Sequence, residues 1–201
     1  MKLKKLKRLL ENSRSLHEDS GDCIVVDVQP MYEKFIDFNI SDFVKYLETR
    51  NDILFFYVGS ENSGIGTDTK EDIMYWLIEN GLDEDKINDI KFIDKGYAFF
   101  REYMDNSRYD DDDIIRIVKY LIEHGERDTR DIEDSDVREE LGLPEDTEEC
   151  IYLPGEFDID DIKGYENAEL VGGGADECLR EIEIYLKAYN YSYRKNYKFI
   201  Y

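Results

Sequence analysis

Short runs of consecutive hydrophobic residues, rich in β-branched and aromatic side chains, recur along the chain and predict strands. Polar residues do not alternate with apolar ones inside these runs, so both faces of each strand are expected to be buried, as is typical of a parallel sheet. The runs are DCIVVDVQ (22–29), DILFFYVGS (52–60), IKFIDKGYAFF (90–100), ECIYLP (149–154), AELVGG (168–173) and YRKNYKFIY (193–201).

Between these runs, hydrophobic positions recur every three or four residues, which predicts helices. Ser41, and Thr69 or Asp68, stand where helix N-caps are expected, and Gly125 stands where a helix should end. The four acids at 110–113 complement the dipole of a helix start and are not expected to form a metal cluster. The helical segments are SDFVKYLETR (41–50), KEDIMYWLIENG (70–81), IIRIVKYLIEHG (114–125) and DECLREIEIYLKAYN (176–190).

Alternation of strands and helices predicts an α/β fold of three layers, Rossmann-like, with a mostly parallel sheet covered by helices on both faces. We expect a single α/β domain over 21–201, with a densely charged insertion at 127–149 that holds one short helix around 137–141. Residues 1–20 form a separate basic, amphipathic arm whose hydrophobic residues fall at helical spacing. These residues are Leu3, Leu6, Leu9 and Leu10.

Composition narrows the class of protein. The formal charge of −23 on 201 residues argues against direct binding to nucleic acid or to an anionic membrane, and leaves a mimic of nucleic acid as a minor alternative. Three cysteines without clustered spacing fit a reducing, cytoplasmic setting, and argue against a disulfide framework or a zinc site. A bias toward Lys, Ile, Asn, Asp and Tyr hints at an AT-rich genome, such as that of a phage.

Three predicted strands end in residues that together can perform acyl transfer. In open parallel sheets the site lies outside the carboxyl ends of the strands, where Asp27, Lys95 and Cys178 are expected. A carboxylate can take a thiol proton, and a lysine can stabilise the thiolate. Cys178 also opens a predicted helix, whose dipole favours the thiolate form. Backbone N–H groups near Gly174 are candidates for an oxyanion hole.

The segments IVVDVQ (24–29), FIDKGYAFF (92–100) and LVGGGADECL (170–179) resemble, in the same order, motifs of the isochorismatase-like cysteine hydrolases, which include nicotinamidases. The resemblance implies that Cys178 is the nucleophile, Asp27 the general base and Lys95 the third member of a triad. It also implies an oxyanion and substrate loop with a cis peptide at Gly173–Gly174. That loop comprises Gly173, Gly174 and Asp176, together with Gln29.

The resemblance has a limit at the metal site. Nicotinamidases bind a metal through an acid and two histidines that follow the second strand. The corresponding segment here, GSENSGIGTDTKED (59–72), contains no histidine. We therefore expect neither a metal nor another cofactor.

Two functions remain open from the sequence. The first is hydrolysis of a small amide, or of a related C–N or vinyl-ether substrate, through a thioester. The second is a catalytically inactive member of the fold that serves in binding or assembly, for instance in a virion. It is suggested by the insertion, the acidity and the tyrosine-rich end, whose edge strand offers a surface for a homo-oligomer or a protein partner. An open pocket at the three strand ends would favour the enzyme. A pocket filled by Tyr32, Tyr97 or Phe99 would favour the binding protein.

Overall fold

A computed structural model describes residues 21–59, 68–96, 109–143, 151, 153 and 159–201. The predicted basic arm at 1–20 lies outside these residues, as do most of the loop after the second strand, the stretch after Gly96 with Tyr97 and Phe99, and Cys150. Within the described part, no helix is long and apolar enough to cross a membrane.

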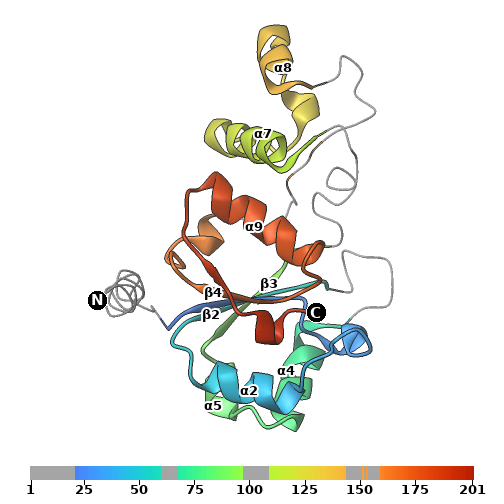
Figure 1. Cartoon of the computed structure of the whole chain (residues 1–201), viewed down its shortest axis with the longest axis vertical. Helices are drawn as coiled ribbons and strands as arrows, with labels where there is room; N and C mark the ends of the chain where they lie inside the picture. Colours follow the sequence, from blue (N-terminus) through green and yellow to red (C-terminus); the bar gives the residue numbers. More distant parts are fainter. Residues whose placement is uncertain (1–20, 60–67, 97–108, 144–150, 152, 154–158) are drawn as a thin grey trace, which may run out of the picture.

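The centre of the molecule is a sheet of five parallel strands in the order β3-β2-β1-β4-β5 (Figure 1). The chain builds one half outward from β1 through β2 to β3, and then returns to the other side of β1 to place β4 and β5. The strands are β1 (Cys23–Val26), β2 (Ile53–Tyr57), β3 (Ile90–Asp94), β4 (Glu169–Gly172) and β5 (Arg194–Lys195).

Helices cover both faces of this sheet, which confirms the predicted three-layer α/β arrangement. Figure 1 shows α2 (Ile40–Glu48), α4 (Lys70–Glu79) and the short α5 (Glu84–Ile87) below the sheet, and α9 (Cys178–Ala188) above it. A further helix, α7 (Asp111–His124), packs on the outer side of α9, and α8 (Ser135–Leu141) in turn contacts α7. Four 3₁₀ turns complete the described chain: Pro30–Tyr32, Thr129–Asp131, Ile159–Ile162 and Tyr197–Phe199.

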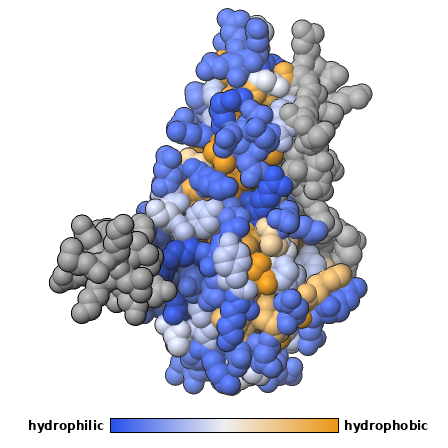
Figure 2. Space-filling model, viewed as in Figure 1, coloured by the Kyte–Doolittle hydropathy of each residue, from blue (hydrophilic) through white to orange (hydrophobic). Residues whose placement is uncertain are grey.

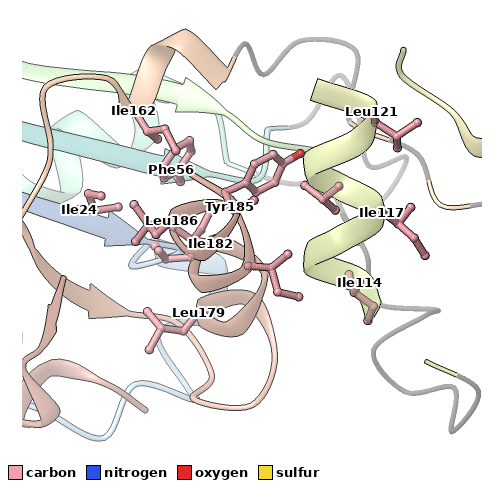
Figure 3. Close-up of a cluster of buried hydrophobic side chains, with 14 of the residues drawn as sticks. Ile24, Phe56, Ile114, Ile117, Leu121, Ile162, Leu179, Ile182, Tyr185 and Leu186 are labelled. Carbon is pink, nitrogen blue, oxygen red and sulfur yellow. The ribbon is translucent and has the colours of Figure 1, made fainter. Parts of the chain in front are cut away.

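Two hydrophobic clusters hold the layers together, one on each side of the sheet. The upper cluster joins strand residues such as Ile24 and Phe56 to α9 and then to α7, with Tyr185 of α9 directed at α7 (Figure 3). Because α9 lies between the sheet and α7, it buries residues on nearly all of its sides. The lower cluster joins the other strand faces to α2, α4 and α5. Burial from both sides explains why the strand sequences read as unbroken hydrophobic runs.

Several predicted boundaries follow from local hydrogen bonds. Thr69 caps α4 in a capping box with Asp72, and Asp110 caps α7 in the same way. Gly125 ends α7 in the left-handed conformation, as expected. For α2, however, the prediction of Ser41 as the cap is wrong, because the side chain of Asn39 accepts the Asp42 N–H instead.

Two predicted strands are also wrong in part. In the segment 193–201 only β5 joins the sheet; the Asn196 side chain then accepts the Lys198 N–H and starts a 3₁₀ turn that buries Phe199 in the lower cluster. In the segment 149–154, the described Ile151 is not in the sheet. Its N–H donates to the Thr129 hydroxyl, and its carbonyl accepts the Thr129 N–H, so it pairs with the charged insertion.

The exterior matches the composition. Hydrophilic residues cover most of the face seen in Figure 2, and hydrophobic residues appear there in small separate areas.

Candidate active site

The candidate site lies at the point where the strand order reverses. β1 and β4 are neighbours, but the chain leaves β1 in one direction and β4 in the other, which opens a crevice at their carboxyl ends. A cavity of about 490 Å³ occupies this crevice. Its described lining residues are Asp27, Tyr32, Phe35, Val58, Lys95, Gly174, Glu177, Cys178, Glu181 and Tyr201. The three predicted triad residues thus meet at one cavity.

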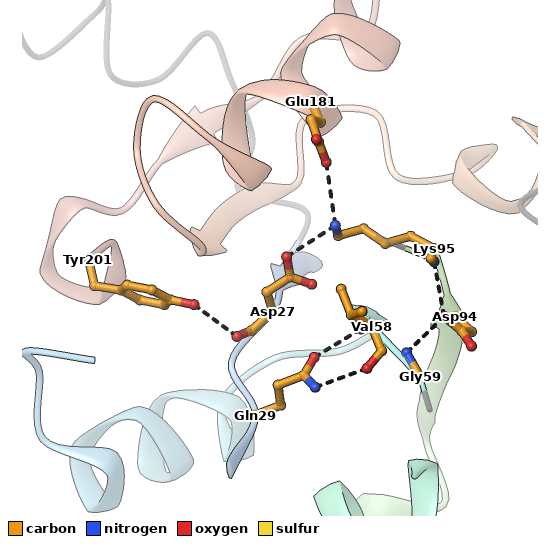
Figure 4. A network of polar contacts seen from close by, with 9 residues as sticks. Asp27, Gln29, Val58, Gly59, Asp94, Lys95, Glu181 and Tyr201 are labelled. Atoms are coloured by element: carbon orange, nitrogen blue, oxygen red, sulfur yellow. Dashed lines mark hydrogen bonds and ion pairs between the residues drawn. The ribbon is translucent and has the colours of Figure 1, made fainter. Parts of the chain in front are cut away.

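Asp27 reaches the cavity through an unusual backbone conformation directly after β1. Its N–H donates to the Phe56 carbonyl at 2.9 Å, which continues the pairing with β2. Its φ is +53°, in the left-handed region that aspartate tolerates better than most residues. The Tyr201 hydroxyl donates to the Asp27 carbonyl at 3.0 Å and holds this turn (Figure 4). Such strain is typical of positions at which function demands a particular side-chain direction.

Lys95 is placed by the residue before it. The Asp94 carboxylate accepts the N–H groups of Gly59 and Gly96, both at 3.0 Å, and so ties the end of β2 to the end of β3 (Figure 4). The Lys95 N–H donates to the Tyr57 carbonyl at 2.9 Å. With its backbone fixed on both sides, Lys95 extends an almost fully buried side chain, 2% exposed, toward β1 and α9.

The Lys95 ammonium lies between two carboxylates. Its Nζ is 3.1 Å from Oδ2 of Asp27 and 3.4 Å from Oε2 of Glu181 (Figure 4). Burial acts to lower the pKa of Lys95, but the charges of Asp27 and Glu181 outweigh it, so the pKa is raised and the ammonium stays charged. Both carboxylates are buried as well, so this contact is not screened by solvent.

Sequence reasoning missed Glu181 as a site residue. It lies three positions after Cys178, which puts both side chains on one face of α9. The sequence did contain a signal for Glu181. It is an acid among the hydrophobic residues of a helix that is buried on nearly all sides, and a buried acid requires a partner.

Cys178 is the first residue of α9, but its thiol does not show the predicted activation. Burial, followed by the charge of Asp27, raises the pKa of the thiol to about 12. Lys95 and the backbone N–H of Gly174 act in the opposite direction without outweighing them. The net effect therefore opposes the thiolate that the helix start was expected to favour, because desolvation of the charged form dominates.

The glycine run makes a tight connection from β4 to α9. Gly172 has a φ of +82°, and a Cβ atom there would lie 2.3 Å from the Val26 carbonyl oxygen. Gly173 has a φ of +63°, and its carbonyl accepts the Tyr201 N–H at 3.2 Å. The predicted cis peptide at Gly173–Gly174 is wrong, as the described peptide bonds are all trans. Two consecutive positive φ angles turn the chain instead.

Two residues assigned to the substrate loop have other surroundings. The Gln29 side chain is fully buried and pairs with Val58 in both directions: it accepts the Val58 N–H at 2.9 Å and donates to the Val58 carbonyl at 3.1 Å (Figure 4). It joins the ends of β1 and β2 and does not line the cavity. Asp176 is exposed and is also not among the lining residues.

Aromatic side chains form the cavity wall without filling it. Tyr32 and Phe35 come from the segment after β1, and Tyr201 comes from beyond β5. Of these, sequence reasoning singled out Tyr32 and missed Tyr201, which lies 174 positions from Asp27 in the chain. Tyr97 and Phe99 lie outside the described residues.

No group of three or more His, Cys, Asp and Glu side chains that suits a metal ion is found in the described part of the chain. Comparison with protein-family models, with curated proteins and with solved structures gave no match.

Proposed function

We propose that the chain is an isochorismatase-like cysteine hydrolase that cleaves a small amide, or a related C–N or vinyl-ether substrate, through a thioester. One observation carries this proposal: the ends of β1 and β3 and the start of α9 bring Asp27, Lys95 and Cys178 to a single cavity. An acid, a buried ammonium and a thiol that line one cavity are the groups that acyl transfer through sulfur requires.

In the proposed reaction with an amide, Cys178 Sγ bonds to the carbonyl carbon while Asp27 accepts the thiol proton. The C–N bond then breaks, and Asp27 returns the proton to the departing nitrogen. Water attacks the thioester, releases the acid and restores the thiol. The raised pKa of the thiol makes proton transfer to Asp27 part of the attack, because little thiolate exists beforehand.

Lys95 and the α9 N-terminus support the charges that develop. The Lys95 ammonium lies 3.1 Å from Asp27 and supplies positive charge beside the carboxylate that acts as base. The N–H of Gly174, which already acts on the sulfur, and that of Cys178 at the helix start are the proposed donors to the oxyanion.

The test is a screen of small aromatic and aliphatic amides for ammonia release, with intact-mass analysis of protein quenched in acid. We expect cleavage of at least one amide, an acyl adduct that maps to Cys178, and loss of turnover to background in Cys178→Ala. Cys23→Ala is the matched control, since Cys23 is buried in β1 away from the cavity. Equal turnover by the two variants, or no cleavage of any amide, would refute the proposal.

The alternative is a catalytically inactive binding protein of the same fold. The raised pKa of Cys178 and the second carboxylate on Lys95 favour it, because both oppose formation of a thiolate. Under this alternative, ligands bind in the cavity and are recovered unchanged, and Cys178→Ala binds them as tightly as the unaltered chain.

A further inference from the structure

Tyr201 is attached to the candidate site through three of its own groups. Its hydroxyl donates to the Asp27 carbonyl at 3.0 Å (Figure 4). Its N–H donates to the Gly173 carbonyl, and its carbonyl accepts the Ala175 N–H, both at 3.2 Å. One residue thus joins the end of β1, which carries the proposed base, to the connection from β4 to α9, which carries a proposed oxyanion donor.

The two backbone hydrogen bonds lie on either side of Gly174. In a ladder of parallel strands, bonds at the peptides before and after a residue turn that residue's own N–H and C=O to the opposite side. The Gly174 carbonyl accordingly accepts the N–H groups of Glu177 and Leu179, at 3.0 and 3.3 Å. The Gly174 N–H acts on the Cys178 sulfur. The backbone of Tyr201 therefore sets the direction of the N–H group that is proposed to bind the oxyanion.

The hydroxyl of Tyr201 holds Asp27 in a conformation that needs support. The φ of Asp27 is +53°, which costs free energy for a residue other than glycine. The Asp27 N–H is engaged by the Phe56 carbonyl, and its Oδ2 lies 3.1 Å from the Lys95 ammonium. With the carbonyl held by Tyr201, these contacts leave Oδ1, which has no hydrogen-bond partner among the described residues, to take the thiol proton.

Tyr201 is itself fixed by the hydrophobic layer below the sheet. Phe199, two residues earlier, is buried in the lower cluster, with its ring centroid 4.9 Å from that of Tyr46. The ring of Tyr201 lies beside Phe38, with centroids 6.3 Å apart. A side chain whose position is limited by packing can hold its hydrogen-bond partners in one arrangement.

The properties of the phenol favour a fixed hydrogen-bond donor over a general acid. Burial, and next the charge of Asp27, raise the pKa of the Tyr201 phenol, so it gives up its proton less readily than an ordinary tyrosine does. The same proton is engaged by the Asp27 carbonyl. Tyr201 is thus suited to hold the site and not to exchange protons with a substrate.

We propose that Tyr201 is a positioning residue of this site: it fixes the backbones of Asp27 and Gly174 relative to each other, and so sets how the base and the oxyanion donor face Cys178. The inference rests on the proposed function for the roles of base and oxyanion donor, whereas the fixing of the Asp27 backbone can be measured without turnover.

The first experiment compares steady-state cleavage of benzamide, nicotinamide and hexanamide by Tyr201→Phe and by the unaltered chain. Phenylalanine keeps the ring in the cavity wall and removes only the hydroxyl, so KM should change less than about threefold. The value of kcat should fall about 10- to 100-fold, because a small displacement of a catalytic group costs that much.

Tyr193→Phe is the matched control for the loss of one buried hydrogen bond from a phenol. The Tyr193 hydroxyl donates to Glu183 at 2.6 Å, and neither residue is among the described lining residues of the cavity. Both kcat and KM of this variant should therefore stay within about twofold of the unaltered chain.

The second experiment measures amide hydrogen exchange by NMR and needs no substrate. In Tyr201→Phe the Asp27 amide should exchange about fivefold faster, because the peptide that follows Asp27 loses its hydrogen bond. The Val25 amide, inside β1, is the internal reference and should not change. Tyr193→Phe should alter neither amide.

If Tyr201→Phe does not fold, as judged by circular dichroism, exchange in the unaltered chain provides the test. The amides of Tyr201 and Ala175 should exchange at least about tenfold more slowly than that of the exposed Asp176, since both donate to backbone carbonyls. Absence of this protection would overturn the proposal.

The outcomes separate the role of Tyr201 from the hydrolase activity. Faster exchange at Asp27 without cleavage of any amide by the unaltered chain supports the fixing of Asp27 by Tyr201 and refutes the hydrolase. Cleavage by Tyr201→Phe within about twofold of the unaltered chain, or a change in KM alone, supports the hydrolase and overturns the role of Tyr201. Exchange at Asp27 that is unchanged, or that rises equally at Val25, also overturns it, as does an equal fall of kcat in Tyr193→Phe.

Discussion

At the scale of single residues, two opposing effects set the protonation state of the Cys178 thiol: desolvation of its charged form and the charges of its neighbours. Cys178 loses water on folding, and the nearby Lys95 ammonium does not offset the cost of burying its thiolate. The resting state that follows is a neutral thiol beside an ion pair. A neutral, desolvated thiol reacts slowly with oxidants and alkylating reagents, because the thiolate is the reactive form.

This state predicts how alkylation of Cys178 depends on pH. Because the pKa is raised to about 12, the thiolate fraction should rise about tenfold per pH unit from pH 7 to 10 without levelling off. A thiol with the ordinary pKa of about 8.5 would level off above pH 9. The measurement is the rate of iodoacetamide labelling, resolved by peptide mass mapping.

Cys23 serves as the internal reference for that experiment. Its thiol pKa is also raised to about 12, but its side chain is completely buried, so it is labelled only when the protein opens. A plateau in the Cys178 rate near pH 8 would contradict the prediction, provided that Cys23 remains unlabelled at the same pH.

At the scale of elements, the connection from β4 to α9 decides whether Cys178 reaches the cavity. Gly172 lies at the end of β4 against the Val26 carbonyl and the Val28 side chain, so the strand passes β1 more closely than any residue with a Cβ atom allows. The turn then delivers Cys178 to the first position of α9. The glycine run thus has a steric purpose in the fold, independent of any role in an oxyanion hole.

Replacement of Gly172 by alanine should lower the free energy of unfolding by roughly 2–4 kcal/mol, from the positive φ together with the clash. Gly142→Ala is a matched control, because Gly142 ends α8 with a φ of +70° and a Cβ atom added there would meet nothing within 4 Å. The Gly142→Ala replacement should lower the free energy of unfolding by only about 1 kcal/mol. Urea denaturation measures both, and equal costs would show that the close approach to β1 contributes nothing.

At the scale of the whole molecule, a charge of −23 acts on every element. Many described ion pairs, such as Lys45–Asp42 and Lys119–Glu123, are exposed and stabilise the fold little. Repulsion among the excess acids is therefore expected to dominate the effect of ionic strength on stability.

Sodium chloride should consequently stabilise the chain. Raising its concentration from 20 to 300 mM should increase the melting temperature by about 3 °C, or about 1 kcal/mol for a chain of this size, because screening weakens the repulsion. Potassium chloride at equal ionic strength should have the same effect and excludes binding of a specific ion. A lower melting temperature in salt would mean that ion pairs outweigh the repulsion.

The sequence by itself determined the layers of the fold and the residues that end its strands. Unbroken hydrophobic runs predicted a buried parallel sheet. Asp27 and Lys95 follow strands directly, and Cys178 opens the helix after a third strand. These positions predicted that the three residues meet, because parallel strands end at one edge of a sheet. Such patterns are local, so each strand or helix can be predicted from the residues of its own segment.

Only the tertiary structure decided what surrounds those residues. The contact of Lys95 with Glu181 spans 86 positions and that of Tyr201 with Asp27 spans 174, and no local pattern specifies such pairs. The burial that raises the pKa of Cys178, the pairing of Gln29 with Val58 and the end of β5 after two residues depend likewise on packing between distant segments. Desolvation and long-range contacts arise only when the layers come together, and they decide the chemistry of the site.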